Sequence, residues 1–130
     1  MAAPDEIVGG APRVLVVDDD QPIRELLAEY LADEGFGVDS AVTIPQAQAC
    51  IAQHTPDLIL LDLMLPGRTG WEFLRERRGD PLLASIPVLV ISAVPPDRLN
   101  SARDLGADAA LSKPFDLEVV SALAHSFVYA

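Results

Sequence analysis

Basic residues are scarce in this sequence of 130 residues, which has 9 Lys and Arg against 20 Asp and Glu, for a formal net charge of −11. Nucleic acid and anionic membrane surfaces attract clustered Lys and Arg, so this balance disfavours both as direct partners. A single cysteine, Cys50, excludes an internal disulfide and a Cys-rich zinc site, and it favours a reducing compartment, most simply the cytoplasm. No apolar run approaches the roughly 18 residues that span a bilayer, and the start of the chain lacks the basic and apolar regions of a secretory signal.

The sequence does contain an alternation of short apolar runs with amphipathic stretches. Continuous runs rich in β-forming residues suit strands that are covered on both faces, as in a parallel sheet. Three such runs are clear and two weaker strands are expected: Val14–Val17, Leu58–Leu61, Val88–Ile91, and the regions Phe36–Ser40 and Ala109–Leu111. Apolar residues at helical spacing lie between and after them. The pattern predicts one α/β domain of five β-α units over residues 13–130, with helices on both faces and a flexible tail over residues 1–12.

Four of these five strands end at polar residues. Asp18, Asp19 and Asp20 follow the first strand, Asp62 follows the third and Ser92 follows the fourth, while Ser112 and Lys113 follow the weak fifth strand. Because the ends of parallel strands meet at one edge of the sheet, these side chains are expected to converge there. Capping would explain one acidic strand end, but not the whole set.

Such a set favours one kind of chemistry. Carboxylates a few ångströms apart repel each other, so they favour a hard divalent cation with oxygen ligands, and Mg²⁺ fits. A carboxylate cluster that holds a cation beside a lysine can receive a phosphoryl group, and one carboxylate can itself be the nucleophile, which gives an aspartyl phosphate.

The motifs at these strand ends resemble the receiver domain of bacterial two-component response regulators, from about Arg13 to Val128. They are Asp18-Asp19, Leu61-Asp62-Leu63-Met64-Leu65-Pro66-Gly67, Ser92-Ala93, and Gly106-Ala107-Asp108 leading to Lys113-Pro114-Phe115. The resemblance implies a flavodoxin-like, doubly wound five-stranded parallel sheet of order 2-1-3-4-5 with five helices, and a cis bond before Pro114.

The resemblance also implies a role for each residue of the site. Asp62 would accept a phosphoryl group from the phosphohistidine of a sensor histidine kinase or phosphotransfer protein. Asp18, Asp19, Asp62 and the main-chain carbonyl of Met64 would hold Mg²⁺, with Asp18 acting mainly through water. Ser92 and Lys113 would each contact a phosphoryl oxygen.

The implied function is a phosphorylation-activated signalling switch and not an enzyme acting on outside substrates, because it catalyses only its own phosphorylation and dephosphorylation. The expected partners are the kinase and a downstream protein or an output domain, with no direct contact to nucleic acid or membrane. The face made by the fourth helix, fifth strand and fifth helix is the expected contact surface, including that of a possible homodimer. Position 130 coincides with the end of the fifth helix, so the expectation is a stand-alone receiver or one cut from a longer regulator.

One position departs from the family pattern. Receivers commonly carry Tyr or Phe three residues before the signature lysine, and here that switch position is Ala110. A methyl group has no inward and outward rotamers, so we expect phosphorylation to be signalled by displacement of the segment Ser92–Asp97, which Pro95 and Pro96 stiffen.

Several other residues receive structural interpretations. Asp20 is expected to cap the first helix, Trp71 to pack in the core and Cys50 to lie half in the core. Pro66-Gly67 and Thr69-Gly70 are expected to shape the loop after Asp62. His54 and His125 are expected on helices away from the strand ends, and Arg75, Arg77 and Arg78 on a solvated helix face.

Three alternatives stay open at this point. A haloacid-dehalogenase-like phosphatase fits Asp18-x-Asp20 but needs acidic metal ligands after the lysine, where only Asp116 and Glu118 follow. A flavodoxin-type FMN protein shares the fold but needs a phosphate-binding loop where three acids stand. A degenerate receiver that serves only as a protein-binding scaffold is the most serious rival.

Overall fold

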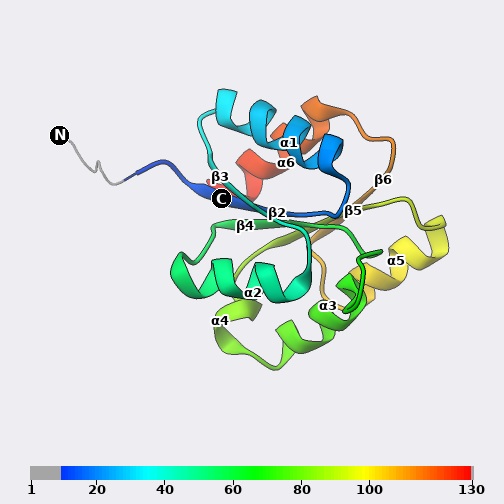
Figure 1. The fold of residues 1–130 in the computed structure, drawn as a ribbon. Coiled ribbons are helices and arrows are strands. Elements are labelled where there is room, and N and C mark those ends of the chain that lie inside the picture. The colour runs from blue at the N-terminus through cyan, green and yellow to red at the C-terminus, as the bar shows by residue number, and fades with distance from the viewer. Residues whose placement is uncertain (1–9, 130) are drawn as a thin grey trace.

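The computed structural model describes residues 10–129, which form a five-stranded parallel sheet covered by helices on both faces (Figure 1). The strands are β2 (Arg13–Val17), β3 (Gly37–Ala41), β4 (Leu58–Leu61), β5 (Val88–Ser92) and β6 (Ala109–Ser112). They lie in the order β3-β2-β4-β5-β6 and all pair in parallel. Counted along the chain this order is 2-1-3-4-5, which confirms the predicted flavodoxin-like sheet.

Within residues 10–129, six helices connect or follow these strands, one more than the five that the sequence pattern predicts. They are α1 (Gln21–Asp33), α2 (Ile44–Gln53), α3 (Gly70–Arg78), α4 (Pro81–Ala84), α5 (Pro96–Asp104) and α6 (Leu117–Val128). The additional helix, α4, is a single turn. Asp80 caps it by accepting hydrogen bonds from the N–H groups of Leu82 and Leu83, and Pro81 takes a first-turn position where no N–H donor is needed.

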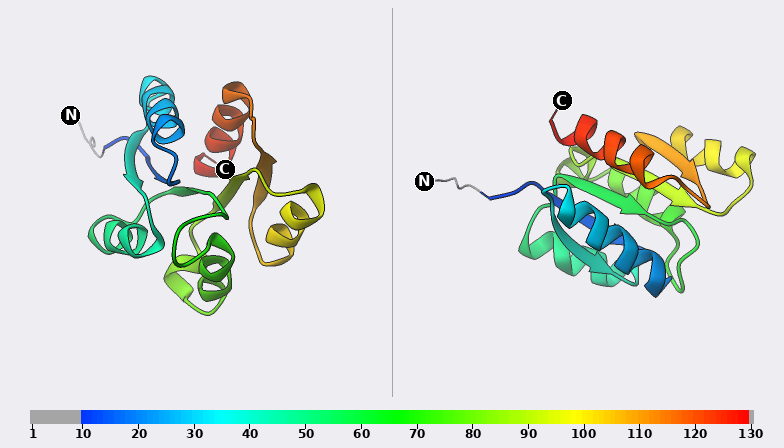
Figure 2. Two further views of the ribbon diagram at one scale, coloured as in Figure 1. Left: turned by 45° about the vertical axis from the view of Figure 1, so that its right-hand side comes forward. Right: turned by 90° about the horizontal axis from the view of Figure 1, so that it is seen from above.

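The two faces of the sheet carry separate hydrophobic cores, and Figure 2 shows from two further directions the helices that cover each face. Helices α1 and α6 cover one face, where Leu27 and Val120 pack against strand residues such as Val16 and Leu60. Helices α2, α3 and α5 lie over the other face, and Phe73 packs there among strand residues of opposite parity. Since alternate residues of a strand point to opposite faces, covering both faces explains why the central strands are continuously apolar.

The ends of several elements follow local backbone chemistry. Asp20 caps α1 by accepting from the N–H of Ile23, as predicted. The edge strand β3 begins at Gly37 and not at Phe36, which is buried beneath α1 and α6. Gly35, with φ of 96°, supplies the left-handed turn between α1 and β3.

Two sequence predictions concern the N-terminal tail and the absence of a membrane-spanning segment. The predicted flexible tail over residues 1–12 falls mostly outside the described residues. Within them, the carbonyl of Pro12 accepts a hydrogen bond from the N–H of Gly37. Between residues 10 and 129, no helix has both the length and the apolar character that a bilayer crossing requires.

The prediction of a solvated basic face on α3 is wrong for Arg77. Its side chain is only 6% exposed and its guanidinium donates hydrogen bonds to the carbonyls of Leu83, Ile86 and Gly106 and to the carboxylate of Asp108. These acceptors come from the α3–β5 and α5–β6 connections, which are distant in sequence. Arg77 therefore joins the two connections at the end of the sheet opposite to the acidic strand ends.

Candidate functional site

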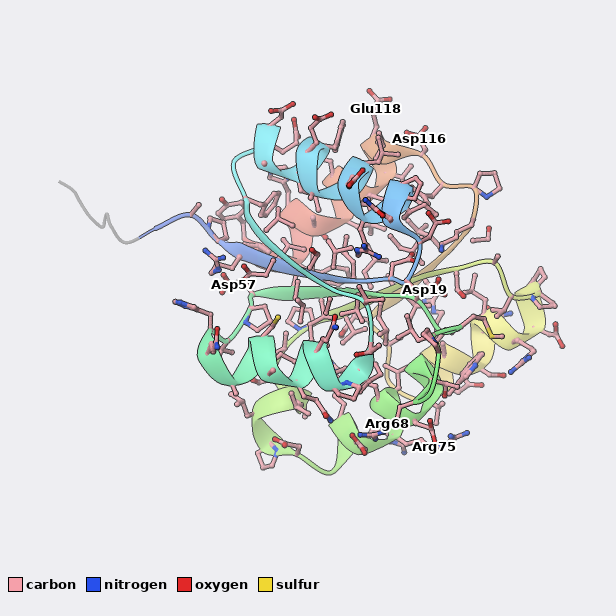
Figure 3. All side chains as sticks on the ribbon, viewed as in Figure 1. Asp19, Asp57, Arg68, Arg75, Asp116 and Glu118 are labelled. Atoms are coloured by element: carbon pink, nitrogen blue, oxygen red, sulfur yellow. The ribbon has the colours of Figure 1, made fainter. Side chains whose placement is uncertain are left out.

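Three carboxylates meet at the carboxyl edge of the sheet. Asp18 and Asp19 directly follow β2, and Asp62 directly follows the neighbouring strand β4. Each offers one oxygen, and these oxygens lie within 4.8 Å of one another. Asp18 and Asp62 are buried whereas Asp19 is exposed, and Figure 3 shows Asp19 at the right-hand rim of the sheet. The convergence that the sequence pattern predicts is therefore present in the structure.

Lys113 reaches the same cluster from the end of β6. Its Nζ lies 2.9 Å from Oδ2 of Asp18 and 2.8 Å from Oδ2 of Asp62, so one ammonium group bridges both buried carboxylates. The side chain of Lys113 is 15% exposed, which leaves the ammonium at the mouth of the site. The peptide bond between Lys113 and Pro114 is cis, as the resemblance implied.

Asp62 is held by two further hydrogen bonds. The hydroxyl of Ser92, at the end of β5, donates to Oδ1 of Asp62 over 2.7 Å, and the main-chain N–H of Met64 donates to the same oxygen over 3.0 Å. Ser92 is fully buried, so its hydroxyl has few alternative partners. The two carboxylate oxygens of Asp62 thus have different neighbours: Oδ1 faces the hydroxyl and the amide, and Oδ2 faces Lys113.

The backbone of this edge is fixed by several contacts. The main-chain N–H of Asp20 donates to Oδ1 of Asp18, and the guanidinium of Arg24 donates to the carbonyl of Asp18. Gly70 begins α3 directly against Asp62: a Cβ placed on it would lie 2.5 Å from the carbonyl oxygen of Asp62. Only glycine permits this approach, so the predicted loop-shaping role of Gly70 takes the form of a close helix-to-strand contact.

The charges of the cluster shift the pKa values of two groups. Burial raises the pKa of Asp18, and the nearby charge of Asp62 adds to the rise. Hydrogen bonds from Lys113 and from the Asp20 N–H oppose it. Burial alone would lower the pKa of Lys113, but its hydrogen bonds to Asp18 and Asp62 and their charges outweigh burial, so the pKa of Lys113 is raised. The site thus holds an excess of negative charge that a single lysine only partly offsets.

The donor set fits Mg²⁺. Three carboxylates with oxygens within 4.8 Å of one another offer the hard ligands that this ion prefers, and the exposed position of Asp19 leaves room for the waters that it retains. The bridging position of Lys113 shows that a cation is already favoured between Asp18 and Asp62.

The switch position lies on the edge strand β6. Ala110 pairs with Val90 of β5 and packs, partly buried, against the core beneath α5. No aromatic ring therefore stands between Ser92 and α5 at this position. The segment that leads from Ser92 to α5 begins with an exposed Ala93, and Pro95 caps α5 without a side-chain hydrogen bond.

The other side chains that were considered from the sequence have structural roles. Cys50 is half-buried in α2, as expected. His125 lies on α6, where its ring meets that of Phe36 with centroids 4.9 Å apart. His54 is not within a helix but follows α2 as its exposed C-cap. Trp71 packs in the core as predicted, with 8% of its surface exposed.

Sequence reasoning missed two residues that support this architecture. Arg24 holds the backbone of Asp18, and its only sequence signal is its place in the first turns of a helix that follows the acidic triplet. Arg77 carried no such signal, because its four acceptor residues lie 6 to 31 residues away along the chain.

Comparisons with known proteins agree with this site and fold. The sequence profile of the response regulator receiver domain matches residues 14–125. The chain is 42% identical over 109 residues to the DNA-binding dual master transcriptional regulator RpaA of Synechocystis, covering 82% of this chain and 45% of that protein. It is 41% identical over 103 residues to the phosphate regulon transcriptional regulatory protein PhoB of Pseudomonas aeruginosa, covering 78% of this chain and 45% of that protein. The chain thus spans about half the length of these relatives.

Solved structures show the same architecture. The receiver domain of Francisella response regulator 1452 superposes with a TM-score of 0.84 at 25% identity, covering 91% of this chain and 97% of that one. The chemotaxis response regulator CheY4 of Vibrio cholerae superposes with a TM-score of 0.82 at 28% identity, covering 90% of this chain and 98% of that one. Together with a profile match that runs from β2 to α6, these likenesses lead to one conclusion: the chain belongs to the response regulator receiver domain family of two-component systems.

Proposed function

We propose that this receiver is switched by phosphorylation of Asp62. Receiver domains are signalling switches and not classical enzymes, and they interact with histidine kinases and output domains. The observation that carries the proposal is the placement of Asp62: a buried carboxylate within hydrogen-bonding distance of both Ser92 and Lys113 and beside two further carboxylates. The phosphoryl donor is the phosphohistidine of a sensor histidine kinase or phosphotransfer protein.

The residues that would hold Mg²⁺ are Asp18, Asp19, Asp62 and the main-chain carbonyl of Met64, with Asp18 acting mainly through water. When bound, Mg²⁺ offsets negative charge on the phosphoryl oxygens and on the surrounding carboxylates, which lowers the repulsion between donor and acceptor. In addition, burial excludes water from Asp62, and the hydrogen bonds from Ser92 and Met64 fix its orientation.

The transfer forms one bond and breaks one bond. A carboxylate oxygen of Asp62 attacks phosphorus, the phosphorus–nitrogen bond of the phosphohistidine breaks, and the imidazole leaves with the electron pair and takes up a proton. In the aspartyl phosphate, Lys113 pairs with one phosphoryl oxygen and the Ser92 hydroxyl donates to another. Both side chains already touch Asp62, so they need to move only by the width of the incoming group.

The readout follows from the position of Ser92. Its shift toward the phosphoryl group displaces the segment Ser92–Asp97 and with it the start of α5, in place of the aromatic rotation that Ala110 cannot provide. The face built from α5, β6 and α6 then changes shape for a downstream protein, an output domain or a second copy of this chain. A cytoplasmic location is part of the proposal, because the kinase phosphohistidine is formed there.

The test is the intact mass of the protein after incubation with acetyl phosphate and Mg²⁺. The wild type gains one phosphoryl group, and Asp62→Asn gains none. The matched control is Asp33→Asn, which removes an exposed carboxylate of α1 and leaves incorporation unchanged. Incorporation that persists in Asp62→Asn would refute the assignment, and a wild type that gains no phosphate would instead indicate a receiver that acts only as a protein-binding scaffold.

A further inference from the structure

Arg24 forms hydrogen bonds on both sides of Asp19, the exposed carboxylate of the acidic cluster. In Figure 3, Asp19 lies where the chain passes from β2 into α1. Because its carboxylate is exposed, its position depends on the backbone on either side of it. The guanidinium of Arg24 donates to the carbonyl of Asp18 over 2.9 Å, directly before Asp19. The main-chain N–H of Arg24 donates to the carbonyl of Asp20 over 3.0 Å, directly after it.

The bond from the guanidinium fixes a peptide plane. The main-chain N–H of Asp18 donates to the carbonyl of Ala41 over 3.1 Å, and Oδ1 of Asp18 accepts from the N–H of Asp20 over 2.9 Å. Arg24 adds a donor for the carbonyl of Asp18. This carbonyl belongs to the planar peptide unit that also carries the N–H of Asp19. The guanidinium therefore sets the orientation of the backbone from which the Asp19 side chain projects.

Charge alone does not explain an arginine at this position. Arg24 lies at the end of the first turn of α1, where the helix dipole disfavours cations, and its charge repels a divalent cation nearby. Helix side chains lean toward the N-terminus, so this half-buried side chain reaches back six residues to Asp18. Lys113 bonds directly to two carboxylates of the cluster, whereas the guanidinium of Arg24 bonds to a backbone carbonyl and leaves the carboxylate oxygens free.

We propose that Arg24 is a positioning residue for Mg²⁺, which holds the peptide unit between Asp18 and Asp19 so that the Asp19 carboxylate stays close to Asp62. The inference rests on the proposed function, because it takes these three carboxylates as the ligands of the ion. Replacing a residue that orients a metal ligand typically weakens metal binding about 10- to 100-fold. Arg24 acts on the backbone of the ligand and not on its carboxylate, so we expect a loss of about tenfold, at the lower end of that range.

Charge and positioning predict opposite results when Arg24 is replaced. The probe is MgCl₂, titrated into metal-free, unphosphorylated ¹⁵N-labelled protein, and the amide signals of Asp19, Asp20 and Met64 give the dissociation constant by NMR. Arg24→Met removes both the charge and the donors. Loss of a repelling charge alone would tighten Mg²⁺ binding, whereas loss of positioning is expected to weaken it about tenfold. Arg24→Lys restores the repelling charge together with a donor, so its affinity is expected to lie between those of the wild type and Arg24→Met.

The control is Arg103→Met, which removes an exposed cation of α5 and is expected to change the affinity for Mg²⁺ by less than about twofold. The titration reads the signals of folded molecules, so a lower stability of a variant does not alter its dissociation constant. If Arg24→Met binds Mg²⁺ as tightly as the wild type or more tightly, or if Arg24→Lys binds it more weakly than Arg24→Met, the inference is overturned and the proposed function is unaffected. A wild type whose amide signals do not respond to MgCl₂ would instead overturn the metal site of the proposed function, and the inference with it.

Discussion

Replacing Lys113 with methionine would measure how much the stability of the protein depends on the one ammonium group that neutralises the buried carboxylates of the site. Lys113 bridges Asp18 and Asp62, whose side chains are 4% and 6% exposed, and methionine keeps most of the apolar stem while removing the charge. Removing one partner of a buried ion pair typically costs about 3–5 kcal/mol, because the other charge stays buried without a counter-ion. In protein freed of metal by EDTA, we therefore expect the free energy of unfolding to fall by about 3–5 kcal/mol at pH 7.

Urea unfolding with and without Mg²⁺ measures both parts of this expectation. Magnesium at 100 times its dissociation constant stabilises the wild type by about 2.7 kcal/mol. The variant is expected to gain at least about 1 kcal/mol more at the same concentration, because its carboxylates no longer share a resident cation. The control is Arg103→Met, which removes an exposed cation of α5. A loss below about 1 kcal/mol in EDTA, or equal gains from magnesium, would refute this electrostatic account.

The pH dependence of the same variant has a defined sign. The pKa of Asp18 is raised in the folded wild type by burial, and loss of the Lys113 hydrogen bond raises it further. Between the unfolded Asp pKa of about 3.9 and that raised folded value, the folded state binds more protons than the unfolded state, so stability increases as pH falls. The deficit of Lys113→Met is therefore expected to shrink on acidification through this window. In the wild type, the raised pKa of Lys113 affects stability at alkaline pH. The stability that the charged Lys113 contributes is fully present below its unfolded pKa of about 10.4. It is lost as pH rises through the raised folded pKa of Lys113.

Two further substitutions test the contacts that hold the sheet connections and the helix α3 in place around the site. Arg77→Met is expected to lower the free energy of unfolding by about 2–4 kcal/mol, because it leaves buried carbonyls without donors. The exposed neighbour Arg78→Met is expected to change it by less than about 0.5 kcal/mol, and equal losses by urea unfolding would contradict the bonding described for Arg77. Gly70→Ala is expected to cost about 1–3 kcal/mol and to slow phosphate incorporation, since the new Cβ would press on the carbonyl of Asp62. Wild-type stability and rate in that variant would show that the contact between α3 and Asp62 is not constrained.

The strands and the cluster of polar side chains at their carboxyl ends could be predicted from the sequence, because the signals for both are local. Residues such as Leu60 and Val90 lie in continuous apolar runs, which arise only when both faces of a strand are covered. A polar residue at the end of each run then locates the carboxyl edge, where parallel strands must bring their ends together. Asp62 and Lys113 meet for this reason although 51 residues separate them.

The features that sequence reasoning missed depend on three-dimensional neighbours. The basic run on α3 gives no sign that Arg77 alone turns inward, because three of its four acceptor residues offer backbone carbonyls, which every residue carries. The single turn of α4 is too short for helical periodicity, and only the Asp80-Pro81 pair signals it. The unsatisfied Nε1 of Trp71 is likewise a property of its surroundings, since the sequence predicts only that the side chain is buried.

The proposed function requires that Asp18, Asp19 and Asp62 jointly hold one divalent cation beside the proposed phosphorylation site. Anomalous scattering from a crystal of the protein soaked in Mn²⁺ tests it most directly, because Mn²⁺ takes the oxygen ligands of Mg²⁺ and its position can be identified without bias. We expect one peak about 2.0–2.3 Å from carboxylate oxygens of Asp19 and Asp62 and from the main-chain carbonyl of Met64. A peak that contacts only one of these carboxylates, or a peak elsewhere on the acidic surface, would contradict it.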